Sequence, residues 1–330
     1  MERLRYEFVL EAAQPIAHHA ESIGNEAILM RRRLRYRGGW AEVPVITGDT
    51  MRHGLREAAA YALLDAAGLL DEGAAALSEA ALRLLFAGGM VTGSSGGAVK
   101  LTEYWQLCDL IPPLALLGGC VSNRVVPGRL VVEDATLVCD EAERYLPPWV
   151  VAYAREQLGD LGSGRACVEE VQRTRMDPTL DPGKRRLLAA DAAKAVQGRL
   201  LASEEAASAE NPAAKEEAKS SLMPRRFERV AQGALFSWCV EATIYTELER
   251  DTFHVMCAAF LARARVGGKR GTGHGHLRPV TARSVGIRRP AEDLDVLDPG
   301  ALAPKIGQLF RAHVAERRGA LKAALDEVVA

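Results

Sequence analysis

The sequence predicts an α+β protein, because segments with strand periodicity and segments with helical periodicity alternate along its 330 residues. Residues 3–10 alternate polar and apolar side chains, which is the pattern of a half-buried strand. Residues 227–245 form a longer strand pattern that is interrupted at Gly233. Residues 251–265 follow the helical period, and their apolar side chains are expected to point inward: Phe253, Met256, Cys257, Phe260 and Leu261.

A strand, a turn and a helix are predicted in succession at residues 44–67. The short apolar run that opens this segment turns at a glycine, and Asp49 or Thr50 is expected to cap the helix that follows. Arg52 and Arg56 are four residues apart, so both should project from one helix face. Free backbone N–H groups and two guanidinium groups would together hold phosphate. An ordinary helix with solvated arginines fits the same spacing.

The other elements follow from the same periodicities. Residues 11–43 are predicted to be a long loop region that contains a β-hairpin through residues 26–36 with its turn at Gly38 and Gly39. Residues 125–138 and 167–174 have strand character, and residues 92–98 are predicted to be a flexible loop. Helices are predicted at residues 77–86, 107–117, 184–209 and 303–329, the second restarting after Pro112 and Pro113 and the last with a phase slip near Gly319.

The positive charge of the chain is concentrated in two short segments. The formal net charge is only −1, so a nucleic-acid-binding protein of this composition must segregate its cations locally. Residues 263–289 contain eight lysines and arginines and no aspartate or glutamate, and residues 31–37 contain five arginines. Hydrophobic residues make up 48% of the chain, which excludes wholesale disorder.

The six cysteines are widely spaced, with no Cys-x-x-Cys pair and no Cys/His cluster. This spacing argues against a zinc site and a disulfide scaffold, so the cysteines are expected to be small buried residues in a reducing cytosol. Charged residues interrupt the opening apolar positions, and no apolar run approaches the length of a membrane span. The sequence therefore predicts a soluble, cytoplasmic protein without a membrane partner.

A basic glycine-rich loop is predicted at residues 267–275. Its five glycines would let a ligand approach the backbone closely, while Lys269 and Arg270 would neutralise phosphate charge. The loop is not a Walker A sequence, and it follows a helix, unlike a Rossmann fingerprint. A plain surface loop is the alternative interpretation.

Two histidine pairs, at residues 18–19 and at residues 274 and 276, raise the question of catalysis or metal binding. Neither pair has a carboxylate or cysteine partner at a diagnostic spacing. Two serines among glycines at residues 94–95 lack the strand–turn–helix context of a nucleophile elbow. We therefore expect no catalytic residue, no metal and no cofactor.

Residues 44–56 resemble the Pro-x-Ile-x-Gly-Ser-x-Leu-Lys/Arg-x-x-Leu-Arg motif of the RAMP superfamily, specifically of the backbone subunits of CRISPR effector complexes. The strand at the start of the chain, residues 86–93 and residues 267–275 occur in the order expected for this superfamily. The Asn-Glu-x-Ile-x-x-Arg-Arg stretch at residues 25–32 is most similar to the type IV branch. The resemblance covers most of the chain and is clearest at residues 1–60 and 225–290.

The resemblance implies a modified RRM (ferredoxin-like) palm with a fingers-like insertion and a projecting thumb. The palm would comprise residues 1–67 and 230–330, the fingers-like insertion residues 68–164, and the thumb residues 165–229. The implied function is a crRNA-binding subunit that assembles head-to-tail into a helical filament on guide RNA, within an antiviral ribonucleoprotein. Its partners would be guide RNA, copies of itself, other CRISPR effector subunits and, by base pairing with the guide, target nucleic acid.

The resemblance also implies which residues contact RNA. Apolar residues at the thumb tip would wedge between bases, and Met176 and Met223 are the candidates. The expected RNA-binding residues are His18, His19, Asn25, Arg31, Arg32, Arg33, Arg52, Arg56, Lys269, Arg270 and His274.

RNA-cleaving relatives carry an aspartate where this chain has Asn25, and an amide cannot replace a carboxylate as a base or a Mg²⁺ ligand. We therefore expect a binding subunit without nuclease activity. One alternative is a metal-dependent ribonuclease of the same superfamily, with Glu26 as the acid if the alignment shifts by one residue. Others are a phosphoester-processing enzyme using His18, Glu26 and the glycine-rich loop, and a small-ligand-binding protein.

Overall fold

A computed structural model of the chain divides into two compact units. The first comprises Met1–Ala20, Leu29–Glu169 and Arg229–Ala330, and the second comprises Glu21–Ile28 and Glu170–Glu228. The expected insertion, residues 68–164, lies within the first unit, and the expected thumb, residues 165–229, nearly coincides with the larger part of the second. The structure describes residues 1–23, 25–70, 77–90, 101–121, 124–173, 181–192, 194–198, 225–286, 292–294 and 307–327.

The first unit is built on an eight-stranded sheet, which confirms the predicted α+β class. Its strand order is β14-β13-β1-β12-β9-β5-β4, and β8 also pairs with β12. The strands are β1 (Glu2–Ala12), β4 (Arg31–Tyr36), β5 (Gly39–Ile46), β8 (Leu130–Val132), β9 (Ala135–Leu137), β12 (Leu235–Ile244), β13 (Leu277–Gly286) and β14 (Glu292–Leu294).

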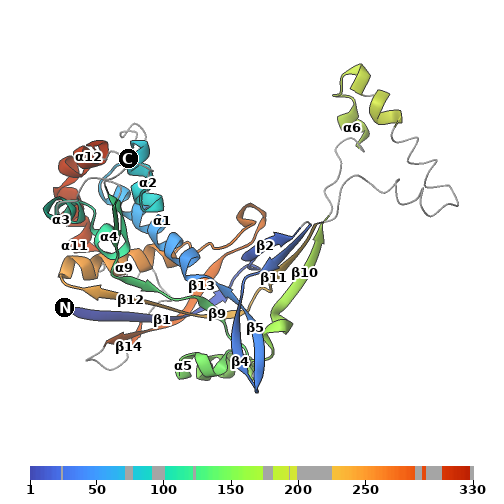
Figure 1. Cartoon of the computed structure of the whole chain (residues 1–330), viewed down its shortest axis with the longest axis horizontal. Coiled ribbons are helices and arrows are strands. Elements are labelled where there is room, and N and C mark those ends of the chain that lie inside the picture. The colour runs from blue at the N-terminus through green and yellow to red at the C-terminus, as the bar shows by residue number, and fades with distance from the viewer. Residues whose placement is uncertain are drawn as a thin grey trace. The chain divides into compact units, whose positions relative to one another are not determined.

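Two long helices, α1 (Gly48–Ala66) and α9 (Glu247–Leu261), lie along one side of this sheet (Figure 1). Along the chain, α1 follows β1, then β8 and β9 precede β12, and α9 leads into β13. This β-α-β-β-α-β succession, with β1 in the sheet between β12 and β13, is the ferredoxin-like arrangement shared with RRM domains. The expected fold of the core is therefore confirmed.

The core between the sheet and these helices follows from the strand period of β1. Leu4, Tyr6, Phe8 and Leu10 are all buried on the same face. The Tyr6 ring stacks on Phe253 of α9 with 5.1 Å between ring centroids. All five residues of α9 that were predicted to point inward are buried.

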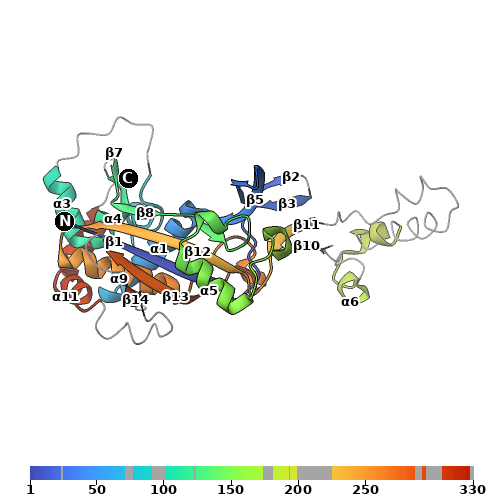
Figure 2. The same cartoon turned by 90° about the horizontal axis from the view of Figure 1, so that it is seen from below.

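The opposite side of the sheet carries α5 (Pro148–Leu158), which crosses in front of the strands in Figure 2. Trp149, near the start of α5, donates its indole N–H to Glu7 of β1 at 2.6 Å. The Arg283 guanidinium of β13 lies 4.9 Å from the Trp149 ring centroid. The 3₁₀ turn η1 (Glu143–Tyr145) precedes α5.

A second hydrophobic cluster lies among shorter helices and the outer part of α1. Of the helix predicted at residues 303–329, the structure describes residues 307–327, which contain two helices that meet at Arg317, close to the predicted phase slip. Similarly, the predicted helix at residues 107–117 is interrupted at Ile111, because Pro112 starts a new helix instead of continuing the old one. The elements here are α2 (Glu79–Ala87), α3 (Leu101–Leu110), α4 (Pro112–Leu117), β6 (Gly118–Val121), β7 (Arg124–Pro127), α11 (Gln308–Glu316) and α12 (Arg318–Glu327).

The region predicted to be mostly loop, residues 11–43, is mostly strand. It contains the end of β1, then β2 (His19–Ile23), β3 (Glu26–Leu29), β4 and most of β5. The hairpin joins β4 to β5 and turns at Arg37 and Gly38, which both have positive φ. The predicted hairpin turn is confirmed to within one residue, but the loop prediction was wrong, because β2 and β4 carry mainly polar residues that conceal their alternation.

The second sheet, built mostly from residues of the second unit, has the order β10-β11-β3-β2. In addition to β2 and β3, this sheet contains β10 (Val168–Arg173) and β11 (Arg225–Val230). Strand β10 confirms the strand predicted at residues 167–174. Strands β11 and β12 together confirm the interrupted strand predicted at residues 227–245. Of the helix predicted at residues 184–209, the structure describes α6 (Pro182–Arg185) and helical residues within 190–198. The predicted loop at residues 92–98 lies outside the described residues. None of the described helices is both long enough and apolar enough to cross a membrane.

Candidate nucleic-acid interface

The start of α1 is occupied by the protein's own side chains. Thr47 is the N-cap, accepting a hydrogen bond from the Thr50 N–H at 3.4 Å, so the predicted cap at Asp49 or Thr50 was wrong by a few residues. The Gly48 N–H donates to Oδ1 of Asp134 at 2.7 Å. The helix N-terminus predicted to hold phosphate therefore already holds a carboxylate.

Asp134 also accepts a hydrogen bond from Nε of Arg32 at 2.5 Å. Burial alone would raise the pKa of Asp134, but the hydrogen bonds from Arg32 and from the Gly48 N–H outweigh burial and lower it. Asp134 is therefore ionised at neutral pH. Arg32, Asp134 and Gly48 line a hollow of about 390 Å³ that opens beside the start of α1.

His18 also contacts the residue that caps the start of α1. The Thr47 N–H donates to Nε2 of His18 at 3.3 Å. Burial lowers the pKa of His18, and the adjacent His19 lowers it further. The imidazole is therefore neutral at neutral pH, and its Nε2 is available as the acceptor that this geometry requires.

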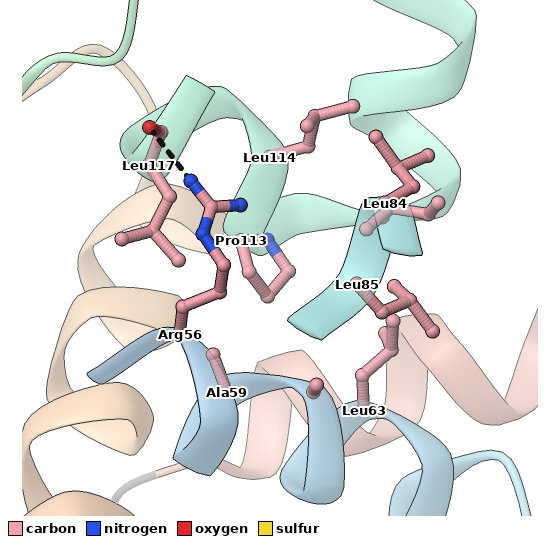
Figure 3. A pocket seen from close by; sticks show the side chains of 10 residues that line it. Arg56, Ala59, Leu63, Leu84, Leu85, Pro113, Leu114 and Leu117 are labelled. Atoms are coloured by element: carbon pink, nitrogen blue, oxygen red, sulfur yellow. Dashed lines mark hydrogen bonds between the residues drawn. The ribbon is translucent and has the colours of Figure 1, made fainter. Parts of the chain in front are cut away.

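Arg52 and Arg56 do project from one face of α1, as their spacing predicted, but they bind backbone carbonyl groups. Arg52 donates to the carbonyl oxygens of Leu130 at 2.8 Å and of Leu117 at 2.5 Å. Arg56 donates to the same Leu117 carbonyl oxygen at 3.3 Å, as Figure 3 shows. Burial lowers the pKa of Arg56 to about 10, and Arg52 adds to this effect. The cavity beside Arg56 has a volume of about 10 Å³ and is lined mainly by apolar side chains, which leaves no room for a ligand. These arginines hold the end of α4 in place.

The glycine-rich loop packs against the segment that ends at His18. The Gly268 N–H donates to the Ala17 carbonyl oxygen at 2.8 Å. Gly267 and Gly275 both have positive φ, and a Cβ atom at either would stand within 2.7 Å of a backbone oxygen. The two ends of the loop are therefore packed against neighbouring backbone, and this close packing requires glycine at positions 267 and 275.

The middle of this loop is exposed. Lys269 and Arg270 lie at the start of the 3₁₀ turn η4 (Arg270–Thr272), and no described atom comes within 4 Å of where a Cβ would stand on Gly271 or Gly273. His274 is different, because only 2% of it is exposed. Its Nδ1 lies 3.0 Å from the Thr272 carbonyl oxygen. The structure thus places His274 inside the loop, where it can position the backbone but cannot reach a phosphate.

The three consecutive arginines of β4 do not share a face. Arg32 points to the face that meets Asp134, whereas Arg31 and Arg33 lie on the opposite face of the strand. Of these three arginines, only Arg32 therefore lies on the same side of β4 as Asp134 and the start of α1.

The remaining predicted residues are distributed as follows. His19 is the first residue of β2 and belongs to the first unit. Asn25 belongs to the second unit and lies in the turn before β3, where its carbonyl oxygen accepts the Arg226 N–H at 2.9 Å. Met176 and Met223 lie outside the described residues. Within the part of the chain that the structure describes, no group of three or more His, Cys, Asp or Glu side chains could hold a metal ion.

Sequence reasoning missed two residues that organise this site. Thr47 precedes the helix, and a threonine at a strand–helix junction is a recognisable capping signal. Asp134 carries no such signal, because it acts on Gly48 across 86 positions of sequence. Only the pairing of β9 with both β5 and β12 brings it there.

Comparison with solved structures found chains that are similar to this one, whereas two other comparisons found none. No protein-family model matches the chain, and no curated protein matches it. Among solved structures, it is similar to a chain of a structure described as "Type IV-B CRISPR Complex", with a TM-score of 0.51 and 17% sequence identity. The match covers 91% of this chain and 99% of that chain. The two chains share a fold.

Proposed function

We propose that this protein is a guide-RNA-binding backbone subunit of a type IV-like CRISPR effector complex, within the RAMP superfamily. The observation that carries the proposal is the fold likeness to a chain of a type IV-B CRISPR complex, which extends over nearly all of both chains. The subunit binds guide RNA, assembles head-to-tail with copies of itself and with other subunits, and leaves guide bases free to pair with target.

The proposed RNA contacts are electrostatic and independent of sequence. Lys269 and Arg270 on the exposed loop, with the arginines of β4, neutralise phosphates, while the open positions at Gly271 and Gly273 admit the sugar–phosphate chain. Arg52, Arg56 and His274 shape the scaffold beneath these contacts. We therefore remove Arg52, Arg56 and His274 from the set of RNA-contacting residues that the sequence predicted.

Replacing Lys269 and Arg270 together with alanine should weaken RNA binding equally for unrelated sequences. Each lost phosphate contact lowers the slope of log affinity against log salt by roughly 0.7 for a single strand, so the slope should fall by up to about 1.4. Fluorescence anisotropy titrations at several salt concentrations measure both quantities. The matched control replaces Arg318 and Lys322 of α12 with alanine and should leave the slope unchanged. A loss restricted to one RNA sequence would refute backbone recognition by this loop.

The complex should bind complementary target without cutting it, whether Mg²⁺ is present or absent. Asn25 supplies no carboxylate, and Glu26 is exposed and faces Arg226 across 3.8 Å. Glu26→Ala should therefore alter no cleavage, since there is none to lose, as judged by gel analysis of end-labelled targets. Target cleavage by the wild type that vanishes in Glu26→Ala would instead identify a metal-dependent ribonuclease.

A further inference from the structure

One face of the β4–β5 hairpin carries a cluster of cations around an exposed indole ring. The antiparallel register pairs Arg35 with Trp40 and Arg33 with Glu42, so these four side chains share a face. Arg31 lies on the same face two residues before Arg33. The function proposed above uses these arginines only as general phosphate contacts and gives no role to Trp40.

Trp40 is 61% exposed, and two neighbouring guanidinium groups lie over its ring. The Arg33 and Arg35 Cζ atoms are 5.4 and 5.3 Å from the ring centroid. These distances are near the outer limit of about 6 Å for a cation–π contact. The guanidinium groups therefore contact the indole only loosely, and more than half of Trp40 remains accessible to a ligand.

The hairpin that presents Trp40 is held firmly. Tyr145 bonds the edge of β4 through its hydroxyl group, which accepts the Arg35 N–H and donates to the Arg35 carbonyl oxygen, each at 3.1 Å. On the opposite face, Leu34 packs against the main hydrophobic core. Little conformational entropy remains to be lost when a ligand covers the ring.

An open π face with flanking cations matches the chemistry of a single-stranded nucleic acid. A base can stack on an aromatic ring whatever its identity, while guanidinium groups pair with the phosphates on either side. Arginines at alternate positions of a strand are about 6.6 Å apart, which suits successive phosphates of an extended chain. A protein partner would need an apolar surface larger than this single indole offers.

We propose that this face of the β4–β5 hairpin is a base-stacking platform, on which one nucleobase of single-stranded RNA stacks on Trp40 while Arg33 and Arg35 hold the flanking phosphates. The proposal rests on the RNA-binding function above and adds a non-ionic contact to it. Glu42, opposite Arg33, opposes phosphate binding and limits the affinity of the platform.

The test compares Trp40→Ala and Trp40→Phe in the full-length protein, using oligouridine and a ribose–phosphate chain of equal length that lacks bases. Trp40→Ala should weaken oligouridine binding by about 5- to 150-fold without changing its salt slope, because stacking releases no counterions. Trp40→Phe should retain most of the affinity. The base-free chain should bind the wild type and Trp40→Ala equally. Oligouridine should also quench wild-type tryptophan fluorescence more than that of Trp40→Phe.

Two controls separate the platform from the proposed function. Trp105→Ala removes an indole of similar exposure, 54%, from α3 and should leave RNA affinity unchanged. Glu42→Gln should tighten binding. If Trp40→Ala binds oligouridine with normal affinity while the wild type binds RNA, the stacking platform is refuted but the proposed function is not. If that variant is defective only in protein assembly, Trp40 makes a protein contact instead, and the platform is again refuted. No binding of RNA by the wild type overturns both proposals.

Discussion

Glu249→Ala is expected to destabilise the protein by about 1–3 kcal/mol, the usual cost of leaving a desolvated polar group without its hydrogen-bonding partner. Glu249 and Arg129 are only 13% and 18% exposed, and one guanidinium N–H meets a carboxylate oxygen at 2.9 Å. Arg129 also donates to the carbonyl oxygens of Ala115 and Thr243, so it ties α4, β12 and α9 together. Without Glu249, the Arg129 charge would remain partly buried with no carboxylate to balance it. Urea denaturation measures the loss.

The matched control is the exposed pair between Glu79 and Arg83 on α2, whose side chains are 75% and 39% exposed. Glu79→Ala should cost less than about 1 kcal/mol, because water screens such pairs. Equal effects of the two substitutions would contradict the assignment of Arg129 and Glu249 as a structural junction.

The contribution of Glu249 should also depend on pH in one direction. Burial would raise its pKa, but hydrogen bonds from Arg129 and the Tyr245 N–H outweigh burial and lower it. A lowered carboxyl pKa stabilises the folded state above the unfolded pKa of about 4.3, and this stabilisation is lost as the pH falls through the folded pKa. The difference in stability between the wild type and Glu249→Gln should therefore shrink in acid.

The sequence predicted the fold where local patterns and tertiary packing agree. The alternation in β1 and the helical period of α9 each identified the residues that are now buried against one another. Strand β2 was missed because its mainly polar residues conceal the alternation, and β3 and β4 were predicted only as part of a hairpin through residues 26–36. No local pattern could show that β3 pairs with the distant β11.

The candidate site was predictable only in part. The spacing of Arg52 and Arg56 placed them on one helix face, but no local pattern could show that the carbonyl oxygens of Leu117 and Leu130 bind them. Trp40 could have been found, since a hairpin turning near Gly38 sets it opposite Arg35. Asp134 could not, because its role depends on the assembled sheet.

Deleting residues 178–222 and joining the ends with a short glycine–serine linker should abolish assembly along RNA while leaving the first unit folded. This whole segment belongs to the second unit, whereas the ferredoxin-like core and the loop at residues 267–275 belong to the first. In the proposed function, the thumb of one subunit docks on the next, so its loss removes one half of a heterologous contact. The variant should retain the thermal unfolding transition of the first unit and bind RNA only as separate copies.

The central claim, head-to-tail assembly on guide RNA, is tested most directly by the mass of complexes formed on RNAs of steadily increasing length, measured by mass photometry. Wild-type protein should add one protomer for each fixed increment of RNA, irrespective of sequence, and the deletion variant should form no such regular series. A single protomer bound at every RNA length, or complexes of the same mass with and without residues 178–222, would contradict the account.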